Sequence, residues 1–309
     1  MSEQKIVVLG TGGTIAGTAG APADNLGYTA AQVGVEQLLQ AVAPLRTLSL
    51  ISEQVAQIDS KDMDFQVWQQ LAVRCAHWLA QPDVQGIVIT HGTDTLEETA
   101  FFLQAVLDPA KPIVLACAMR PANALAPDGP QNLLDAIAVA RTAGARGVVA
   151  VCAGTIHTAD DVTKVHPYRL DAFGSGDAGP LGVVEEGVVR RFRPWPCAPS
   201  LAPVGQIAGA ASWPRVEIVM NHAGAGGALV DALVAQGVHG IVAAGTGNGS
   251  LHHALEAALL KAQASGVKVV RSTRCASGKV LPAPRDTIAD SSGLSPVKAR
   301  IALMLSLLA

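Results

Sequence analysis

Short runs of apolar residues alternate with longer segments of helical periodicity along most of the chain. The short runs are rich in Val, Ile and Leu. Most of them are continuous rather than alternating, which is typical of parallel strands that are buried on both faces. They predict strands at Lys5–Leu9, Thr47–Ile51, Gly86–Thr90, Pro112–Ala116, Gly147–Cys152, Arg215–Asn221, Gly240–Ala244 and Val267–Arg271.

Segments with apolar residues at every third or fourth position lie between these strands. In Asp62–Leu79, for example, the apolar residues from Trp68 onwards form one stripe along a helix. The same periodicity predicts helices at Thr95–Leu107, Gln131–Thr142, Ala228–Gln236, Leu251–Ala264 and Pro296–Leu308. Repeated strand–helix units of this kind indicate an α/β fold with an open, doubly wound and mainly parallel sheet.

The alternation is interrupted once, between Arg191 and Pro214. This stretch contains five prolines and no long apolar period. Proline lacks a backbone donor and fits poorly in helices and central strands, so the stretch is typical of a linker. We therefore expect a larger N-terminal α/β domain at residues 1–190, a proline-rich linker at 191–214 and a smaller C-terminal α/β domain at 215–309.

Composition narrows the class of protein. Half of the 309 residues are hydrophobic and 15% are charged, which supports a folded core and excludes intrinsic disorder. A net charge of −3 argues against a nucleic acid partner. No apolar run reaches the roughly 18 residues of a membrane span. The N-terminus also lacks the apolar region of a signal peptide, so we expect a cytoplasmic protein with no membrane partner.

Metal and disulfide chemistry are not expected. The five cysteines are odd in number and show no CxxC spacing, so we expect reduced thiols. The adjacent His252 and His253 lack carboxylates or cysteines at the spacing of metal ligands.

A glycine-rich segment, GTGGTIAG at Gly10–Gly17, follows the first predicted strand. Ligands of open α/β sheets bind beyond the carboxyl ends of the strands, so this position is a candidate site. Neither a dinucleotide fingerprint nor a P-loop fits, because Ile15 replaces a required glycine and Thr18 replaces a required lysine. Two interpretations remain: a tight turn, or a pliable loop that presents the hydroxyls of Thr11 and Thr14.

The third predicted strand leads into a second polar segment, ITHGTDTLEE at Ile89–Glu98. Thr95 and Glu98 have the spacing of a capping box, which predicts that a helix begins there. The first N–H groups of that helix would favour negative charge beside Thr93 and Asp94. The alternative is that these side chains only compete to cap the helix.

Two hydroxyl-bearing loops without a phosphate or metal motif suggest acyl transfer by a threonine nucleophile. A threonine hydroxyl is a weak nucleophile and needs a base nearby. Lys164 in DDVTK is one candidate base, although the sequence alone does not bring it to Thr93. His91 is expected to be a structural hydrogen-bonding residue, because no HExxH pattern or Ser-His-Asp order recruits it.

Together, GTGGTIAG and ITHGTDTLEETAFFL resemble the two signature segments of the bacterial-type L-asparaginase (asparaginase/glutaminase) family. Further segments follow in the order of that family along essentially the whole chain. They are Tyr28 in LGYTAAQ, Ser60 in QIDSKDM, AMRP at Ala118–Pro121, DGPQNL at Asp128–Leu133, DDVTK at Asp160–Lys164, GPLG at Gly179–Gly182 and VVRSTR at Val269–Arg274.

The resemblance implies a fold and an activity. The implied fold is an asparaginase-like pair of α/β domains joined by a linker. The implied reaction is hydrolysis of L-asparagine to L-aspartate and ammonia without a cofactor. The implied assembly is a homo-oligomer, most often a tetramer of two intimate dimers. Each active site then lies between the N-terminal domain of one subunit and the C-terminal domain of its partner.

The resemblance also implies roles for particular residues. The catalytic matches are Thr14, Tyr28, Thr93, Asp94 and Lys164. We expect Thr14 to form the covalent bond, because the surrounding glycines permit it to approach and retreat, with Tyr28 on a lid beside it. Ser60 and Asp94 match residues that hold the α-carboxylate and α-amino groups of the substrate. Lys164 acts as a base or as a fixed positive charge, and its environment decides between the two.

One substrate-binding position departs from the family pattern in the N-terminal domain. Lys61 follows Ser60, where well-known members carry glutamine or glutamate facing the substrate's α-ammonium. A cation there would repel the substrate, so Lys61 either points outward or weakens binding.

A second departure lies in the C-terminal domain. Relatives place a glutamate from the partner subunit against the same ammonium, and here Pro284 or Arg285 falls near that position. Asp286 is the nearest acidic substitute, and Ser250 in GTGNGSLHH matches a small polar contact. We therefore expect a higher Michaelis constant than in strongly binding relatives, and little glutamine turnover.

Two other functions remain as alternatives. One is a glutaminase-asparaginase of broader specificity. The other is a non-catalytic protein that senses an amino acid, although binding alone does not need two threonines and a lysine. The amidohydrolase subunit of a tRNA-dependent amidotransferase would need an additional tRNA-binding portion, which 309 residues with a net charge of −3 do not provide.

Overall fold

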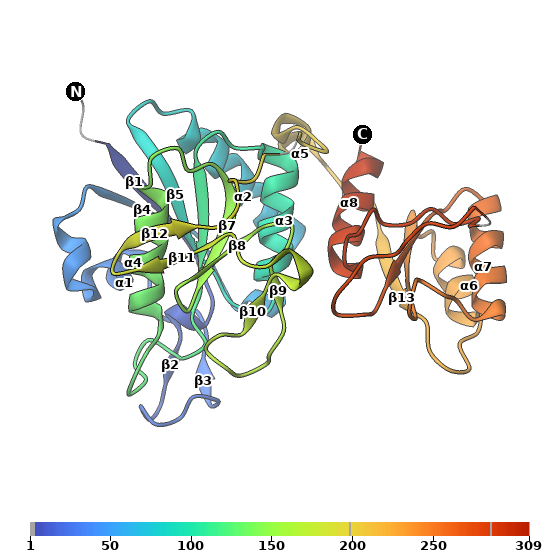
Figure 1. Ribbon diagram of the computed structural model, residues 1–309, viewed down its shortest axis with the longest axis horizontal. Coiled ribbons are helices and arrows are strands. Elements are labelled where there is room, and N and C mark those ends of the chain that lie inside the picture. The colour runs from blue at the N-terminus through green and yellow to red at the C-terminus, as the bar shows by residue number, and fades with distance from the viewer. Residues whose placement is uncertain (1–3, 198, 285, 309) are drawn as a thin grey trace. The chain divides into compact units, whose positions relative to one another are not determined.

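An eight-stranded sheet organises the larger of the two units of the chain, Met1–Ala208 and Gly209–Ala309 (Figure 1). The computed structural model describes residues 4–197, 199–284 and 286–308. The strand order is β12-β11-β8-β7-β6-β5-β1-β4. The strands are β1 (Lys5–Gly12), β4 (Leu50–Ile58), β5 (Val84–Thr90), β6 (Pro112–Ala116), β7 (Gly147–Cys152), β8 (Thr155–Thr158), β11 (Gly182–Glu185) and β12 (Val188–Arg191).

The five strands from β7 to β4 run parallel, and β8, β11 and β12 add an antiparallel edge. The predicted mainly parallel sheet is therefore confirmed. The first strand, β1, lies between β4 and β5, so the order of connection reverses beside it. The crevice at such a reversal is where open α/β sheets bind ligands. The loops after β1 and β5 lie at that point.

Helices cover both faces of this sheet (Figure 1). On one face α1 and α4 share an apolar cluster with alternate strand residues such as Val8 and Val88. On the other face α2 and α3 pack together, and Trp68 stacks on Phe102 with ring centroids 4.8 Å apart. The helices are α1 (Val35–Ala41), α2 (Phe65–Leu79), α3 (Leu96–Leu107) and α4 (Gly129–Ala140).

Two small hairpins project from the carboxyl edge of the sheet and carry candidate site residues. The first pairs β2 (Thr18–Ala19) with β3 (Tyr28–Thr29). The second pairs β9 (Thr163–Lys164) with β10 (Phe173–Gly174). Neither hairpin was predicted, because two-residue strands leave no apolar period in the sequence.

The second unit is a smaller α/β layer structure with a parallel sheet in the order β13-β14-β15. Helices α6 and α7 share one apolar cluster with the sheet. Helix α8 packs against all three strands, and its Leu303 lies against Gly240. The elements are β13 (Val216–Met220), β14 (Gly240–Gly245), β15 (Lys268–Thr273), α6 (Ala228–Ala235), α7 (His253–Ala264) and α8 (Pro296–Leu308).

Besides the two hairpins and helix α1, which were not predicted, further features differ from the sequence prediction. The strand expected at 47–51 begins at Leu50, because Pro44 starts a 3-10 helix, Ala43–Thr47, ahead of it. The antiparallel strands β8, β11 and β12 were missed, since they are short. The proline-rich stretch contains the short helix α5 (Val204–Gly209), which begins directly after Pro203. Proline is tolerated at the start of a helix because an N–H group there has no partner within the helix.

The cysteines are free thiols, with Cys75, Cys117 and Cys152 buried and Cys197 and Cys275 exposed. Within the described ranges, no helix has the length and apolar character needed to cross a membrane.

Two buried histidines predict how stability depends on pH. Burial lowers the pKa of His91 and of His157 to about 4, against about 6.5 in an unfolded chain. Between these values the unfolded chain binds more protons, so the free energy of unfolding falls as pH drops from about 6.5 to about 4. Each histidine contributes roughly 3 kcal/mol to that loss.

Urea unfolding between pH 7 and pH 4.5 checks this expectation. His157→Asn, which keeps a polar group near Ser175, should flatten the pH dependence relative to the wild type, whereas His253→Gln at an exposed site on α7 should leave it unchanged. Equal slopes in the wild type and the His157 variant would contradict the assignment.

Candidate active site

Close contact between two glycines brings the candidate loops together. A Cβ on Gly13, after β1, would lie 2.3 Å from the backbone N and Cα of Gly92, after β5. Gly13 also has φ +80° and ψ −171°, a conformation that essentially only glycine adopts. A Cβ on Gly92 would in turn lie 2.4 Å from Oγ of Ser60, which follows β4. The loops after β1 and β5 therefore meet backbone to backbone, the Ser60 side chain packs against Gly92, and Thr14, Thr93 and Ser60 lie in one region.

Thr14 and Tyr28 form the first polar pair. Thr14 begins a single 3-10 turn (Thr14–Ala16) and is buried, with 7% of its surface exposed. Its hydroxyl lies 2.7 Å from the hydroxyl of Tyr28, and either oxygen can donate. Tyr28 belongs to β3 and pairs with Ala19 of β2, so the first hairpin positions the Tyr28 hydroxyl beside that of Thr14.

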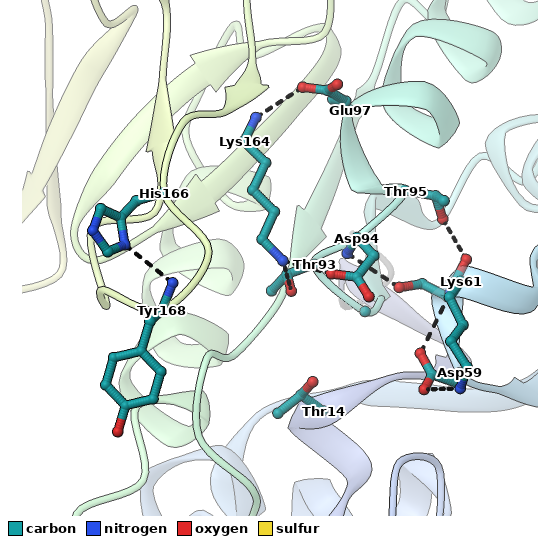
Figure 2. A network of polar contacts seen from close by, with 12 residues as sticks. Thr14, Asp59, Lys61, Thr93, Asp94, Thr95, Glu97, Lys164, His166 and Tyr168 are labelled. Atoms are coloured by element: carbon teal, nitrogen blue, oxygen red, sulfur yellow. Dashed lines mark hydrogen bonds and ion pairs between the residues drawn. The ribbon is translucent and has the colours of Figure 1, made fainter. Parts of the chain in front are cut away.

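Thr93, Asp94 and Lys164 form the second polar group (Figure 2). The Lys164 amine donates to Thr93 Oγ1 at 2.9 Å and to Asp94 Oδ1 at 2.5 Å. Thr93 is buried, whereas the Asp94 side chain is 53% exposed. The amine therefore links a buried hydroxyl to a carboxylate that solvent and ligands can reach. In Figure 2 the Thr14 hydroxyl points toward this group.

The backbone around Lys164 explains how a residue from a distant segment reaches Thr93. The Lys164 N–H donates to a carboxylate oxygen of Glu97 at 2.8 Å, which ties β9 to the first turn of α3 (Figure 2). The preceding turn is held by Asp161, which accepts bonds from Thr158 Oγ1 at 2.7 Å and from the Arg193 guanidinium at 2.8 Å. These contacts fix the strand that carries the amine.

Ser60 organises the start of α3. Its hydroxyl accepts a bond from the Asp94 N–H at 3.2 Å, and its carbonyl accepts one from the Thr95 hydroxyl at 2.8 Å. The predicted start of a helix at Thr95 is confirmed, but the side-chain bond that Thr95 would make in a capping box is absent, although Thr95 is the N-cap of α3. Its hydroxyl bonds to Ser60, which the fold brings from β4. The Ser60 hydroxyl still has its own proton to donate.

Lys61 is drawn toward acidic neighbours on its own turn. Its amine lies 2.6 Å from Asp59 Oδ2 and 3.6 Å from Asp62 Oδ2, and the side chain is 63% exposed (Figure 2). The hydrogen bond to Asp59 raises the pKa of Lys61. The cation is thus paired with carboxylates and stays charged.

Ser250 and Asp286 lie in the second unit. Ser250 is exposed, and its backbone pairs with Thr246 in an isolated bridge. Asp286 accepts bonds from the Arg271 guanidinium on both carboxylate oxygens and one from the Ala283 N–H at 2.6 Å. Arg285 lies outside the described residues. The predicted acidic substitute is therefore held by residues of its own unit.

His91 and His252 both make hydrogen bonds to backbone groups of the fold. His91 is buried, and its Nδ1 lies 2.7 Å from the Gly92 carbonyl oxygen. Its low pKa keeps it neutral near pH 7. His252 caps α7, because its Nδ1 accepts the Ala254 N–H at 3.2 Å. Among the described residues, no group of three or more His, Cys, Asp or Glu side chains could hold a metal ion.

Sequence reasoning missed two residues that shape the site. Glu97 lies in the second signature segment, but nothing in its pattern indicates a bond to Lys164. Asn132 joins the carboxyl ends of two strands, since it donates to the Cys117 carbonyl at 2.9 Å and accepts from the Ala153 N–H at 3.0 Å. Its place in DGPQNL was the one available signal.

Comparison with known proteins identifies the class. The model of the N-terminal asparaginase domain matches residues 5–196, and that of the glutaminase/asparaginase C-terminal domain matches residues 215–309. The chain belongs to the asparaginase family. The resemblance stated from the signature segments and the predicted two-domain α/β fold are both confirmed.

Individual relatives match over nearly the full chain. L-asparaginase 2 of Bacillus subtilis (strain 168) is 39% identical over 322 residues, covering 99% of this chain and 84% of the relative. Glutaminase-asparaginase of Pseudomonas fluorescens biotype A is 39% identical over 311 residues, covering 98% and 86%. The crystal structure of a probable cytoplasmic L-asparaginase from Campylobacter jejuni superposes with a TM-score of 0.93 at 37% identity, covering 99% of this chain and 95% of that one.

The contact between the two glycines can be tested without substrate. Gly13→Ala should lower the free energy of unfolding by about 2–4 kcal/mol, because the added Cβ meets backbone and the conformation is strained. Gly20→Ala is the matched control: its Cβ would meet no atom within 4 Å, so we expect a change within about 0.5 kcal/mol. Urea unfolding at pH 7 measures both. Equal stabilities of the two variants would contradict the contact.

Proposed function

We propose that this protein hydrolyses L-asparagine to L-aspartate and ammonia through an acyl-enzyme on a threonine. One observation carries the proposal: the Lys164 amine bonds to the buried Thr93 hydroxyl and to Asp94, beside a second buried threonine that bonds to Tyr28. Binding alone does not need two such hydroxyls. The family membership and the names of the relatives support the same reaction.

In the first half of the proposed reaction, Thr14 Oγ1 attacks the side-chain carboxamide carbon of the substrate. Tyr28, 2.7 Å away, passes the hydroxyl proton on to the amide nitrogen, so the C–N bond breaks and neutral ammonia departs. In the second half, water attacks the resulting ester and releases aspartate. Thr14 is the preferred nucleophile because it lies on a glycine-rich turn beside the first hairpin, which lets it approach the substrate and withdraw.

Thr93, Asp94 and Lys164 act on the opposite side of the carboxamide. A charged Lys164 holds Thr93 Oγ1 by donation and stabilises negative charge there, whereas a neutral Lys164 accepts the Thr93 proton as a base. Both roles use the same contact of 2.9 Å. Helix α3 begins at Leu96, directly after this group, so the positive end of its dipole adds to the effect.

Ser60 and Asp94 are the proposed binding groups for the amino-acid end of the substrate. Ser60 has a proton to donate to the α-carboxylate, and the half-exposed Asp94 carboxylate is available to the α-ammonium. In this proposal the Lys61 side chain points away from the substrate, because Asp59 and Asp62 pair with its amine. It therefore need not oppose the substrate's ammonium.

The proposal includes a homo-oligomer in which the partner's second unit completes each site. Ser250 and Asp286 are its proposed contributions, and a tetramer is the proposed assembly. The bonds between Asp286 and Arg271 mean that its carboxylate would arrive already paired, which favours weaker binding of the substrate's ammonium. A cytoplasmic location remains a prediction, in line with the solved relative described as a probable cytoplasmic enzyme.

A glutaminase-asparaginase of broader specificity is the second candidate. It is favoured by the relative from Pseudomonas fluorescens, which bears that name at 39% identity. The departure at Asp286 favours the narrower activity. A non-catalytic sensor is disfavoured by the complete set of catalytic matches.

Ammonia release tests the proposal directly. The purified protein should release ammonia from asparagine, little from glutamine and none from a simple amide such as acetamide. Thr14→Ala, Thr93→Ala and Lys164→Met should each lower kcat by more than about 10³-fold, because Thr14 is the proposed nucleophile and Thr93 and Lys164 are the proposed groups that stabilise charge or accept a proton opposite it. Thr142→Ala, whose hydroxyl bonds to Ala138 at the end of α4, should retain full activity.

Two results would overturn this account. One is failure to release ammonia from asparagine. The other is unchanged turnover after Thr14 and Thr93 are both replaced by alanine. Equal efficiency on glutamine and asparagine would instead select the second candidate.

A further inference from the structure

Residues 17–29, which contain β2 and β3 and are called the lid below, are joined to the loop between β6 and α4 (117–128) by four hydrogen bonds. Two are between backbone groups: Ala122 N–H donates to the Gly17 carbonyl at 2.8 Å, and Leu125 N–H donates to the Pro22 carbonyl at 3.0 Å. The other two come from one side chain, that of Asn123.

Asn123 pairs with the edge of the lid as a neighbouring strand would. Its Oδ1 accepts from the Ala19 N–H at 2.8 Å, and its Nδ2 donates to the Ala19 carbonyl at 2.7 Å. Ala19 pairs on its other side with Tyr28, whose hydroxyl bonds to Thr14. A series of contacts therefore leads from Asn123 through the paired residues Ala19 and Tyr28 to Thr14.

The loop that carries Asn123 is itself anchored. Both carboxylate oxygens of Asp128 accept backbone N–H groups of this loop, from Met119 at 2.9 Å and from Arg120 at 3.0 Å. The Arg120 guanidinium donates to the Ala126 carbonyl at 2.9 Å. Asn123 itself is exposed, so water can replace either of its bonds. Because the loop is anchored and the Asn123 side chain is exposed, the contact between Asn123 and Ala19 can break and form again without rearrangement of the loop.

We infer that Asn123 is a positioning residue that latches the lid and thereby holds Tyr28 on Thr14. The inference rests on the proposed function, because the contact between Tyr28 and Thr14 matters for turnover only if Thr14 is the nucleophile. The latch as a physical contact does not depend on that function. It stabilises the closed lid relative to an open one, and substrate entry and product release require its two bonds to break.

Hydrogen–deuterium exchange of the free protein tests the latch without substrate. In Asn123→Ala, peptides covering residues 17–29 should exchange about tenfold faster, because two bonds that oppose lid opening are lost. Peptides covering β1 and β5 should keep their wild-type rates. Leu125→Ala is the matched control: its side chain is 79% exposed and its bond to Pro22 uses backbone atoms, so lid exchange should not change.

Asn123→Asp provides a second variant of almost unchanged size, in which a carboxylate replaces the donor to Ala19. It should also exchange faster in the lid alone. Wild-type lid exchange in both variants would overturn the latch. Faster exchange throughout the first unit would also overturn it, because that pattern indicates a structural role.

Kinetics link the latch to turnover. Asn123→Ala should lower kcat/KM for asparagine by about five- to thirtyfold, and combining it with Tyr28→Phe should cost less than the product of the two single effects, since both act through the same contact. Multiplicative effects would contradict the link from Asn123 to Tyr28. If the wild type releases no ammonia, the proposed function fails, and the exchange experiment still decides the latch.

Discussion

The candidate site depends on one steric constraint, the backbone contact between Gly13 and Gly92. Each loop leaves a parallel strand at the place where the order of the sheet reverses. A side chain on Gly13 would force the two loops apart, and one on Gly92 would collide with the Ser60 side chain. Because the loops touch, two threonine hydroxyls from segments far apart in the sequence lie in one region. Ser60 enters the same contact from the third adjacent strand, which brings a further polar group to the crevice without any long loop.

Two polar systems lie around this constraint, that of Thr93, Asp94 and Lys164 and that of Thr14 and Tyr28. The system of Thr93, Asp94 and Lys164 is tied to α3 through Glu97 and to the sheet through Asp161, so it is fixed. The system of Thr14 and Tyr28 lies on a 3-10 turn and a hairpin of two-residue strands, which bonds to the loop between β6 and α4. The proposed two-step acyl transfer uses both systems, because the nucleophile must approach the substrate, hold the acyl group and release it.

Periodicity predicted the parallel strands and most helices, because a buried strand or an amphipathic helix requires a recognisable pattern of apolar residues within a short segment of sequence. It also placed Thr14 and Thr93 at strand ends. It could not bring Lys164 to Thr93, since that approach depends on β9 and β10 and on bonds to Glu97 and Asp161. The helix start at Thr95 was predicted, but the partner of the Thr95 hydroxyl was not, because the Ser60 carbonyl comes from the loop after another strand. The direction of the Lys61 side chain likewise depends on its ion pair with Asp59, which the sequence alone did not reveal.

The central claim is that Thr14 carries the acyl group. Rapid acid quenching of the protein during turnover of asparagine, followed by peptide mapping by mass spectrometry, tests it most directly. The account predicts an aspartyl adduct on the peptide that contains Thr14, absent from Thr14→Ala, and an unmodified peptide around Thr93. An adduct on Thr93 in an active wild-type sample would contradict the claim.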